Sequence, residues 1–153
     1  MARSFLLCVA LGLGWSTAVA AAEPTSKTSA TVEVTTISSS KFQLHAIEDQ
    51  LIRQTNAQRA RYGLAPLQVC ENLMQSARSH TIWMCRSNSL QHTRAQVAEN
   101  IALGQTTTAE AVQSWLNSPG HRANMLSGRY NRIGAAAYQA GNGRIYWCLQ
   151  FLH

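Results

Sequence analysis

The C-terminal segment constrains the fold most, because the strand that it predicts is apolar on both faces. Alternate residues of a strand point to opposite faces of a sheet. In residues 145–151 one face would carry Ile145, Trp147, Leu149 and Phe151, and the other Tyr146, Cys148 and Gln150. Both sets are largely apolar, and a strand with two apolar faces must be covered on both sides. The segment therefore predicts a sheet sandwiched between layers.

Two segments in the first half of the chain have apolar residues at helical spacing. The first begins at Leu44 and ends near Gly63, with Leu51 and Thr55 on its apolar face. The second helix has an apolar face formed by Leu73, Ala77, Thr81 and Met84. Its tryptophan, Trp83, is predicted to belong to the core, as are Trp115 and Trp147.

The second half of the chain predicts one more helix and a closing hairpin. Thr107 and Glu110 have the spacing of a capping box at the start of a helix. Pro119-Gly120 would end that helix, with a short helical turn at 121–126. Residues 88–97 are polar and predict a loop, whereas 99–104 and 133–138 predict strands. The turn at 141–143 joins the last two strands. Helices followed by a hairpin predict an α+β sandwich.

The N-terminal region predicts export. Residues 1–20 have a basic start, an apolar run and a small-residue cleavage site, which is typical of a secretory signal peptide. The alternative is a retained membrane anchor, but the apolar run is short for a span of about 20 residues. Residues 21–42 are rich in Thr and Ser and predict a flexible linker. The ordered domain is predicted at 43–153, in a secreted or periplasmic protein without an integral membrane span after signal removal.

The formal net charge is +6, and 11 of the 13 basic residues are arginines spread along the chain. No basic run is present, so nucleic acid is not an expected partner. Attraction to anionic envelope polymers or lipid headgroups is one interpretation of this charge, and solubility alone is the other.

After signal removal three cysteines remain, Cys70, Cys85 and Cys148. An exported protein can hold a disulfide. A continuous helix would separate Cys70 from Cys85 by about 22 Å, whereas a disulfide needs Cα atoms within about 7 Å. Either of these two could pair with Cys148, and at least one of the three is unpaired or pairs with another chain.

Two histidines and one acid are the strongest candidates for a functional site. His121 follows Pro119-Gly120, and His92 lies in the polar loop. Two neutral imidazoles can supply two zinc ligands, although each histidine could also simply pack. Glu99 is one of only seven acidic residues and is predicted near a strand edge. It could orient a histidine or accept backbone N–H groups, and the spacing does not decide between these roles.

A nucleophilic arrangement of Ser118, a histidine and Glu99 is a weaker hypothesis. No Gly-x-Ser-x-Gly motif is present. A serine directly before Pro-Gly is more typical of a turn at the end of a helix. The spacing of a zincin-type protease is also missing.

These motifs, taken in order, resemble the bacterial branch of the CAP superfamily, the cysteine-rich secretory, antigen 5 and pathogenesis-related proteins, also called SCP-like extracellular proteins. The resemblance runs from Leu44 to Phe151. The segments that carry it are Asn56-x-x-Arg59, Gly63, Pro66-Leu67, His92, Glu99-Asn100-Ile101, Trp115, Ser118-Pro119-Gly120-His121-Arg122-Ala123-Asn124, Gly134 and 146–151.

The resemblance implies a three-layer α-β-α sandwich with a central antiparallel sheet. It also implies a cleft that contains His92, Glu99 and His121, together with Ser118, and that could hold zinc or another divalent cation through His92 and His121. Many members carry a second Glu where this chain has Ser118. A mechanism that needs two carboxylates is therefore not expected here.

The leading functional hypothesis is a secreted, non-enzymatic binding module, monomeric or weakly dimeric. By resemblance its partner is a small apolar ligand of the sterol or lipid class, or an envelope component. The alternative is a metal-assisted, peptidase-like hydrolase of the envelope or extracellular space, with Glu99 as the candidate catalytic residue. A third interpretation is a structural module with a vestigial site.

Overall fold

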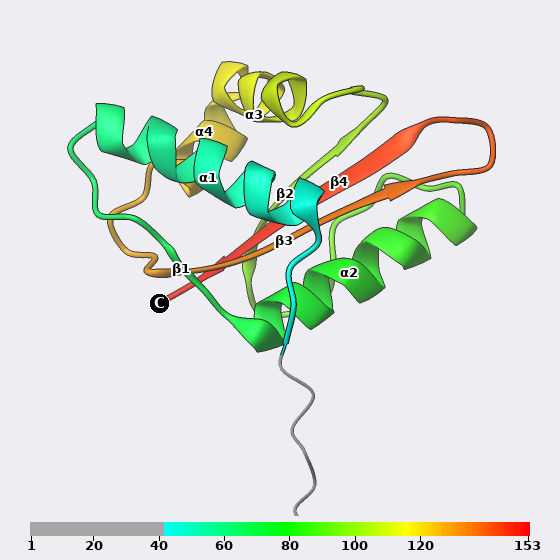
Figure 1. Ribbon diagram of the computed structural model, residues 1–153, viewed down its shortest axis with the longest axis horizontal. Helices are drawn as coiled ribbons and strands as arrows, with labels where there is room; N and C mark the ends of the chain where they lie inside the picture. The colour runs from blue at the N-terminus through cyan, green and yellow to red at the C-terminus, as the bar shows by residue number, and fades with distance from the viewer. Residues whose placement is uncertain (1–41) are drawn as a thin grey trace, which may run out of the picture. The chain divides into compact units, whose positions relative to one another are not determined.

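The computed structural model describes residues 42–153, so the predicted signal peptide and all but the last residue of the predicted linker lie outside the described part of the chain. Helices and strands follow one another in the order shown in Figure 1. They are α1 (Ala46–Arg61), β1 (Gln68–Val69), α2 (Glu71–Arg86), β2 (Ala98–Leu103), α3 (Thr108–Asn117), α4 (Pro119–Met125), β3 (Arg132–Gln139) and β4 (Ile145–Leu152).

The four strands form one sheet in the order β1-β3-β4-β2. The three longer strands are antiparallel, and β4 lies between its partners β2 and β3. The two-residue strand β1 was not predicted and pairs with β3 in parallel. The predicted turn is present, and Gly143 adopts a φ of +82° there, a conformation that glycine takes without strain.

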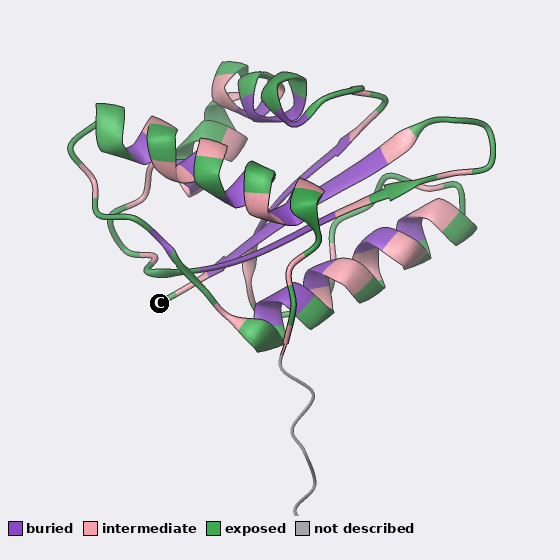
Figure 2. Cartoon of the chain, viewed as in Figure 1, coloured by how far each residue is buried: buried purple, intermediate pink, exposed green. Residues whose placement is uncertain are grey.

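Helices cover both faces of the sheet, which confirms the predicted α-β-α sandwich (Figure 1). Helix α2 packs on β3 and β4 from one side. On the other side α1 packs on β3, while α3 and α4 pack on β2. Figure 2 shows the consequence, with buried residues concentrated in the strands and on the sheet-facing sides of the helices.

The two faces of β4 contact different layers, as its apolar alternation predicts. Trp147, Leu149 and Phe151 pack with residues of α1, α3 and α4 in the larger hydrophobic cluster. Tyr146 and Cys148 pack against α2 in a smaller cluster. Residues 146–151 are all buried, so this strand forms the middle of the core.

Helix α2 approaches the sheet closely at its first turn. A Cβ atom added to Gly134 of β3 would lie 2.3 Å from the backbone carbonyl atoms of Leu73. No real Cβ tolerates that distance, so a side chain at this position would push the helix away from the strand. The buried face of α2 is the predicted one and includes Leu73, Ala77, Thr81 and Met84.

The exit of α1 is held by two polar side chains of the Asn56-x-x-Arg59 motif. Asn56 donates to the carbonyl of Leu67 (3.0 Å) and accepts from the amide of Leu67 (2.8 Å). Arg59, only 2% exposed, donates to the backbone carbonyls of Ala65 after α1, of Met125 at the end of α4 and of Ser127 just beyond it. Desolvation lowers the pKa of this guanidinium. The motif therefore connects α1 to the segments around it.

The structure decides two questions that the sequence left open or answered wrongly. Cys70, Cys85 and Cys148 are all free thiols, and α2 runs unbroken between Cys70 and Cys85. The assignment of Trp83 to the core was wrong, because this side chain is 46% exposed. Trp83 lies at the margin of the buried face of α2, and from this position its side chain points to solvent. Within residues 42–153 no helix has the length and apolar character needed to cross a bilayer.

Candidate functional site

Strand β2, the loop before it and helix α4 bring the candidate residues together. Glu99 is the second residue of β2, which is an edge strand of the sheet. His92 lies in the preceding loop, and His121 lies in α4. The imidazole rings of His92 and His121 are 6.1 Å apart between their centres and tilted by 51°. Residues 29 positions apart in the chain thus face each other beside one acid.

Glu99 is the buried centre of this arrangement, with a side chain that is only 3% exposed. Its Oε1 accepts from the amide of Thr93 and lies 2.9 Å from Nδ1 of His92. Its Oε2 accepts from Nε2 of Gln150 at 2.9 Å and from the thiol of Cys148 at 3.6 Å. A buried carboxylate needs such donors, because an unpaired charge in the interior is costly. Both oxygens of Glu99 are occupied, which favours an orienting role over that of a general base.

The contact with Glu99 sets the hydrogen position on His92. A carboxylate only accepts hydrogen bonds, so Nδ1 of His92 carries the proton and donates it. Nε2 then keeps its lone pair. The side chain of His92 is 57% exposed, which leaves this nitrogen open to a ligand. A histidine held by a carboxylate in this way is a common arrangement for a metal ligand.

The backbone of His121 is fixed to β2 by two asparagines. Asn100, which is fully buried, donates to the carbonyl of His121 (2.9 Å) and accepts from Nδ2 of Asn124 (3.0 Å). Asn124 also lies 3.3 Å from the carbonyl of Glu99. Partial burial, and then the neighbouring His92, lower the pKa of His121. A lowered pKa keeps the ring neutral, the form in which imidazole binds metals.

Cys148 contributes a donor and no reactivity to this site. It is fully buried in β4, and burial, followed by the charge of Glu99, raises the pKa of its thiol well above the ordinary value. The sulfur therefore stays protonated, whereas a nucleophilic cysteine needs the thiolate. Its role is to hold Glu99.

Ser118 occupies the junction between two helices. Its amide donates to the carbonyl of Trp115 at the end of α3, and its carbonyl accepts from Arg122 in α4. Among residues 42–153 no hydrogen bond joins the Ser118 side chain to His92, Glu99 or His121. These contacts are those of a turn residue.

Sequence reasoning missed several residues of this region. Gln150 and Cys148 approach Glu99 from β4, and the alternation of that strand was the available signal, since both lie on one face. His80 of α2 is another: its Nε2 lies 2.8 Å from the carbonyl of Gln91 and 3.7 Å from Oε2 of Glu99. The available signal was its spacing, because residues three apart on a helix are neighbours, and His80 indeed stacks on Trp83.

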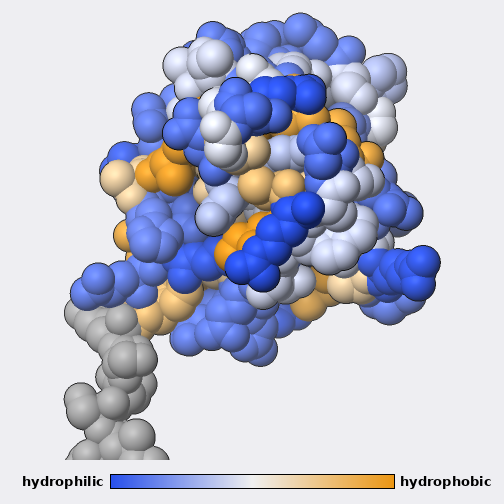
Figure 3. Space-filling model, turned by 90° about the vertical axis from the view of Figure 1, so that its right-hand side faces the viewer, coloured by the Kyte–Doolittle hydropathy of each residue, from blue (hydrophilic) through white to orange (hydrophobic). Residues whose placement is uncertain are grey.

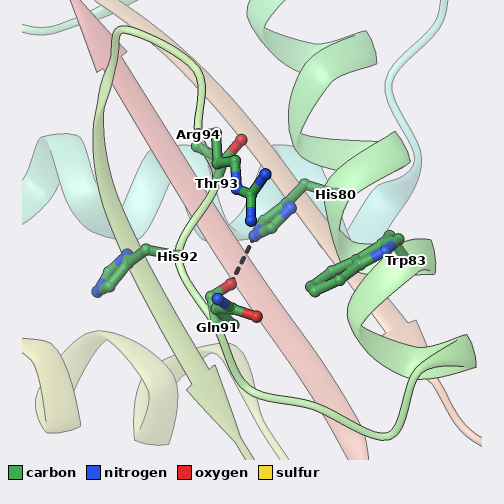
Figure 4. Close-up of a pocket in the computed structure, with 6 residues that line it drawn as sticks. All are labelled: His80, Trp83, Gln91, His92, Thr93 and Arg94. Atoms are coloured by element: carbon green, nitrogen blue, oxygen red, sulfur yellow. Dashed lines mark hydrogen bonds between the residues drawn. The ribbon is translucent and has the colours of Figure 1, made fainter.

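A pocket of about 450 Å³ opens beside the site (Figure 4). Its walls come from two segments: His80 and Trp83 project from α2, and residues 91–94 from the following loop. Figure 4 marks the hydrogen bond between His80 and Gln91 that links the two walls. His92 belongs both to the pocket and to the pair of histidines, so a ligand in the pocket would reach the site.

The donor set fits a divalent metal only in part. An imidazole nitrogen lies about 2.0–2.1 Å from a bound zinc ion, so the centres of two rings sharing one ion are about 5–6 Å apart. The observed 6.1 Å is close to this range. Among residues 42–153 no group of three or more His, Cys, Asp and Glu side chains is arranged to hold an ion. Protein ligands would therefore be His92 and His121, with Glu99 behind His92.

Comparison with known proteins identifies the family. The model of the CAP, cysteine-rich secretory protein, family matches residues 52–151, and the chain belongs to that family. It is 34% identical over 145 residues to the uncharacterized protein YkwD of Bacillus subtilis, an alignment that covers 83% of this chain and 55% of YkwD. It is 29% identical over 122 residues to the uncharacterized membrane protein YlbC of Bacillus subtilis, covering 69% of this chain and 34% of YlbC. The chain thus spans about half or less of these relatives.

Solved structures share the fold. An SCP-domain extracellular protein from Bacillus anthracis is 24% identical, with a TM-score of 0.62, over 69% of this chain and 40% of that one. An outer surface protein from Borrelia burgdorferi is 18% identical, also with a TM-score of 0.62, over 67% of this chain and 89% of that one. At these identities the likeness concerns the fold alone.

Proposed function

We propose that this protein is an exported CAP domain that acts as a non-enzymatic binding module and holds a divalent cation, with zinc as the first candidate, between His92 and His121. The single observation that carries the proposal is the pair of imidazoles 6.1 Å apart, one of them oriented by a buried carboxylate. The exported location rests on the predicted signal peptide and on the family. A monomer or a weak dimer is the expected state.

The bound ion would take one nitrogen from each ring, and solvent or a partner group would complete its shell. Glu99 would accept the hydrogen bond from Nδ1–H of His92, which fixes the orientation of the ring and leaves Nε2 for the ion. The lowered pKa of His121 favours the neutral ring that an ion requires. When bound, the ion supplies a positive centre to which an anionic group of a partner can bind.

The contacts of Glu99 favour binding over hydrolysis. A hydrolase that uses this acid as its base needs a carboxylate oxygen free to take a proton from water. Both oxygens of Glu99 already accept hydrogen bonds, and the side chain is 3% exposed. A carboxylate that is buried and already held by several donors is suited to orienting His92, so the binding role is the one proposed.

Calorimetric titration of the apo protein with zinc chloride tests the proposal. The wild type is expected to bind one ion, and His92→Ala and His121→Ala are each expected to weaken binding at least about tenfold. His45→Ala and His153→Ala remove exposed imidazoles elsewhere and serve as matched controls. Equal heats in the wild type and in the His92→Ala, His121→Ala double variant would reject the metal site.

A further inference from the structure

One surface of the molecule combines an exposed indole with two arginines. It is called the Trp83 surface below, and its residues are Ser79, His80, Ile82, Trp83 and Arg86 of α2, Ser87, and residues 91–94 of the following loop. Two hollows lie on it. One, of about 450 Å³, is lined by His80, Trp83 and residues 91–94. The other, of about 380 Å³, is lined by Ser79, Ile82, Trp83, Arg86 and Ser87. Trp83 is common to both.

Trp83 differs from the two tryptophans of the core. Trp115 and Trp147 are 1% and 0% exposed, and each donates its indole N–H to a backbone carbonyl at 3.0 Å. Trp83 is 46% exposed, and within the described part of the chain its indole N–H has no hydrogen-bond acceptor. An exposed indole offers a flat apolar face and a free donor, a combination typical of binding surfaces.

The position of this indole is set before any ligand arrives. The ring of His80 stacks on Trp83 with the centres 5.6 Å apart and the planes 11° from parallel. His80 is held in turn, because its Nε2 donates to the carbonyl of Gln91 at 2.8 Å. A pre-oriented side chain loses less conformational entropy when a ligand binds.

The charge of the Trp83 surface is positive and unneutralised. Arg86 lines one hollow and Arg94 the other, and both are exposed. Among the ion pairs of residues 42–153 neither arginine takes part. Residues 79–98 contain no aspartate or glutamate, and the next acid in the chain, Glu99, is buried. Two free guanidinium groups, one on each hollow, therefore favour a ligand with more than one anionic group.

The separation of the apolar patches at this end of the molecule argues against a lipid as the ligand. Figure 3 views the end of the molecule at which α2 finishes and the β3–β4 turn lies, and this face is mainly hydrophilic with separate apolar patches. A lipid or sterol would need a continuous apolar surface. A single-stranded nucleic acid would need a series of aromatic platforms along a basic groove, and this surface has one platform.

We propose that the Trp83 surface binds an acidic polysaccharide, with a sugar ring packed on the Trp83 indole and carboxylates of the chain reached by Arg86 and Arg94. A polymer of rings and repeated anionic groups is the ligand class that matches two hollows, one shared indole and one arginine on each hollow. The inference deepens the proposed binding role, and it does not depend on the metal site, because only His92 belongs to both.

Binding of polygalacturonate to the full protein, measured by calorimetry at low and moderate salt, tests the inference. Trp83→Ala is expected to weaken binding about tenfold or more, and Trp83→Phe, which keeps a ring, to weaken it less. Arg86→Ala and Arg94→Ala are each expected to weaken binding about three- to tenfold and to reduce its salt dependence. Thermal melting checks that every variant is folded.

Matched controls separate the Trp83 surface from general positive charge. Arg61→Ala and Tyr62→Ala remove an exposed arginine and an exposed aromatic ring at the end of α1, and both are expected to bind like the wild type. Neutral dextran is expected not to bind. The inference is overturned if Arg61→Ala weakens polygalacturonate binding as much as Arg94→Ala does. It is also overturned if folded Trp83→Ala binds polygalacturonate like the wild type. Tighter binding of oligo-dT or of anionic phospholipid vesicles than of polygalacturonate would also overturn it.

The metal proposal and this inference fail separately. Polygalacturonate is titrated into apo protein in the presence of a chelator, where the expected binding persists. Loss of zinc binding with retained polysaccharide binding would reject the metal site alone. Zinc binding without any polysaccharide binding would reject the Trp83 surface alone.

Discussion

Arg59 and Glu99 are both charged and both buried, yet their partners differ in kind. Arg59 is 2% exposed and donates to the backbone carbonyls of Ala65, Met125 and Ser127 at 2.8–3.0 Å. Glu99, whose side chain is 3% exposed, accepts mainly from side chains. One of those side chains belongs to His92, which is 57% exposed.

This difference separates a structural charge from a charge that is connected to the surface. The hydrogen bonds of Arg59 end inside the protein and join the segments after α1 and α4 to α1. Those of Glu99 continue through an exposed imidazole to solvent, where a ligand can bind. A buried charge is costly in either case, but only Glu99 orients a side chain that a ligand can reach.

The largest expected effect is on stability. In Arg59→Met four backbone carbonyls lose this donor, one of them a long contact of 3.4 Å, and each buried group left unsatisfied costs about 1–3 kcal/mol. We expect the free energy of unfolding to fall by about 3–5 kcal/mol, measured by urea denaturation. Arg61→Met, an exposed neighbour, should change it by less than about 0.5 kcal/mol. A loss below about 1 kcal/mol in Arg59→Met would contradict a structural role for Arg59.

Glu99→Gln should affect stability less and binding more. The amide keeps one acceptor oxygen but presents an NH₂ group to donors, so we expect a loss of about 1–3 kcal/mol in unfolding free energy. Zinc affinity should fall about 10–100-fold, as for other partners of a metal-bound histidine. Glu71→Gln, at an exposed acid of α2, is the matched control. Reduced stability with unchanged zinc affinity would make Glu99 equivalent to Arg59.

His92→Asn should separate binding from folding. Because the imidazole is 57% exposed, its removal is expected to lower the unfolding free energy by less than about 1 kcal/mol. Zinc binding should nevertheless weaken at least about tenfold, as in His92→Ala. A stability loss as large as that of Glu99→Gln would show that the hydrogen bond from His92 serves the core.

An exposed acid provides the smallest effect and a pH test. Hydrogen bonds from the amide and hydroxyl of Thr106 lower the pKa of Glu110 at the start of α3. With a folded pKa below the unfolded one, its stabilising contribution is present above about pH 4.5 and is lost as the pH falls through the folded pKa. The difference in Tm between wild type and Glu110→Gln should therefore shrink between about pH 6 and pH 3. A difference independent of pH would show that the charge is not involved.

The helices, the longer strands and the sandwich were predictable from the sequence. Periodicity on α2 indicated its buried face, and the two apolar faces of β4 indicated the covered sheet. These features were accessible because each depends on the pattern within one segment. Strand β1 was not, since two residues carry no pattern and pair only because β3 lies beside them.

The sequence named candidate residues for a site but not the contacts between them. His92, Glu99 and His121 were singled out by their motifs, whereas Gln150 and Cys148 were not. Their approach to Glu99 depends on the register between β2 and β4, which pairs Glu99 with Gln150. Trp83 was assigned to the core because its helical position lies at the edge of the apolar face, where periodicity gives no decision.

The sequence by itself determined the helices, the longer strands and the layered α+β sandwich, because apolar periodicity and turn chemistry act over a few neighbouring residues. Only the tertiary structure decided which oxygen of Glu99 holds His92, how near the two imidazoles lie, and that the Trp83 indole is left to solvent. Those properties depend on groups far apart in the chain that meet when the strands pair and the helices pack on them.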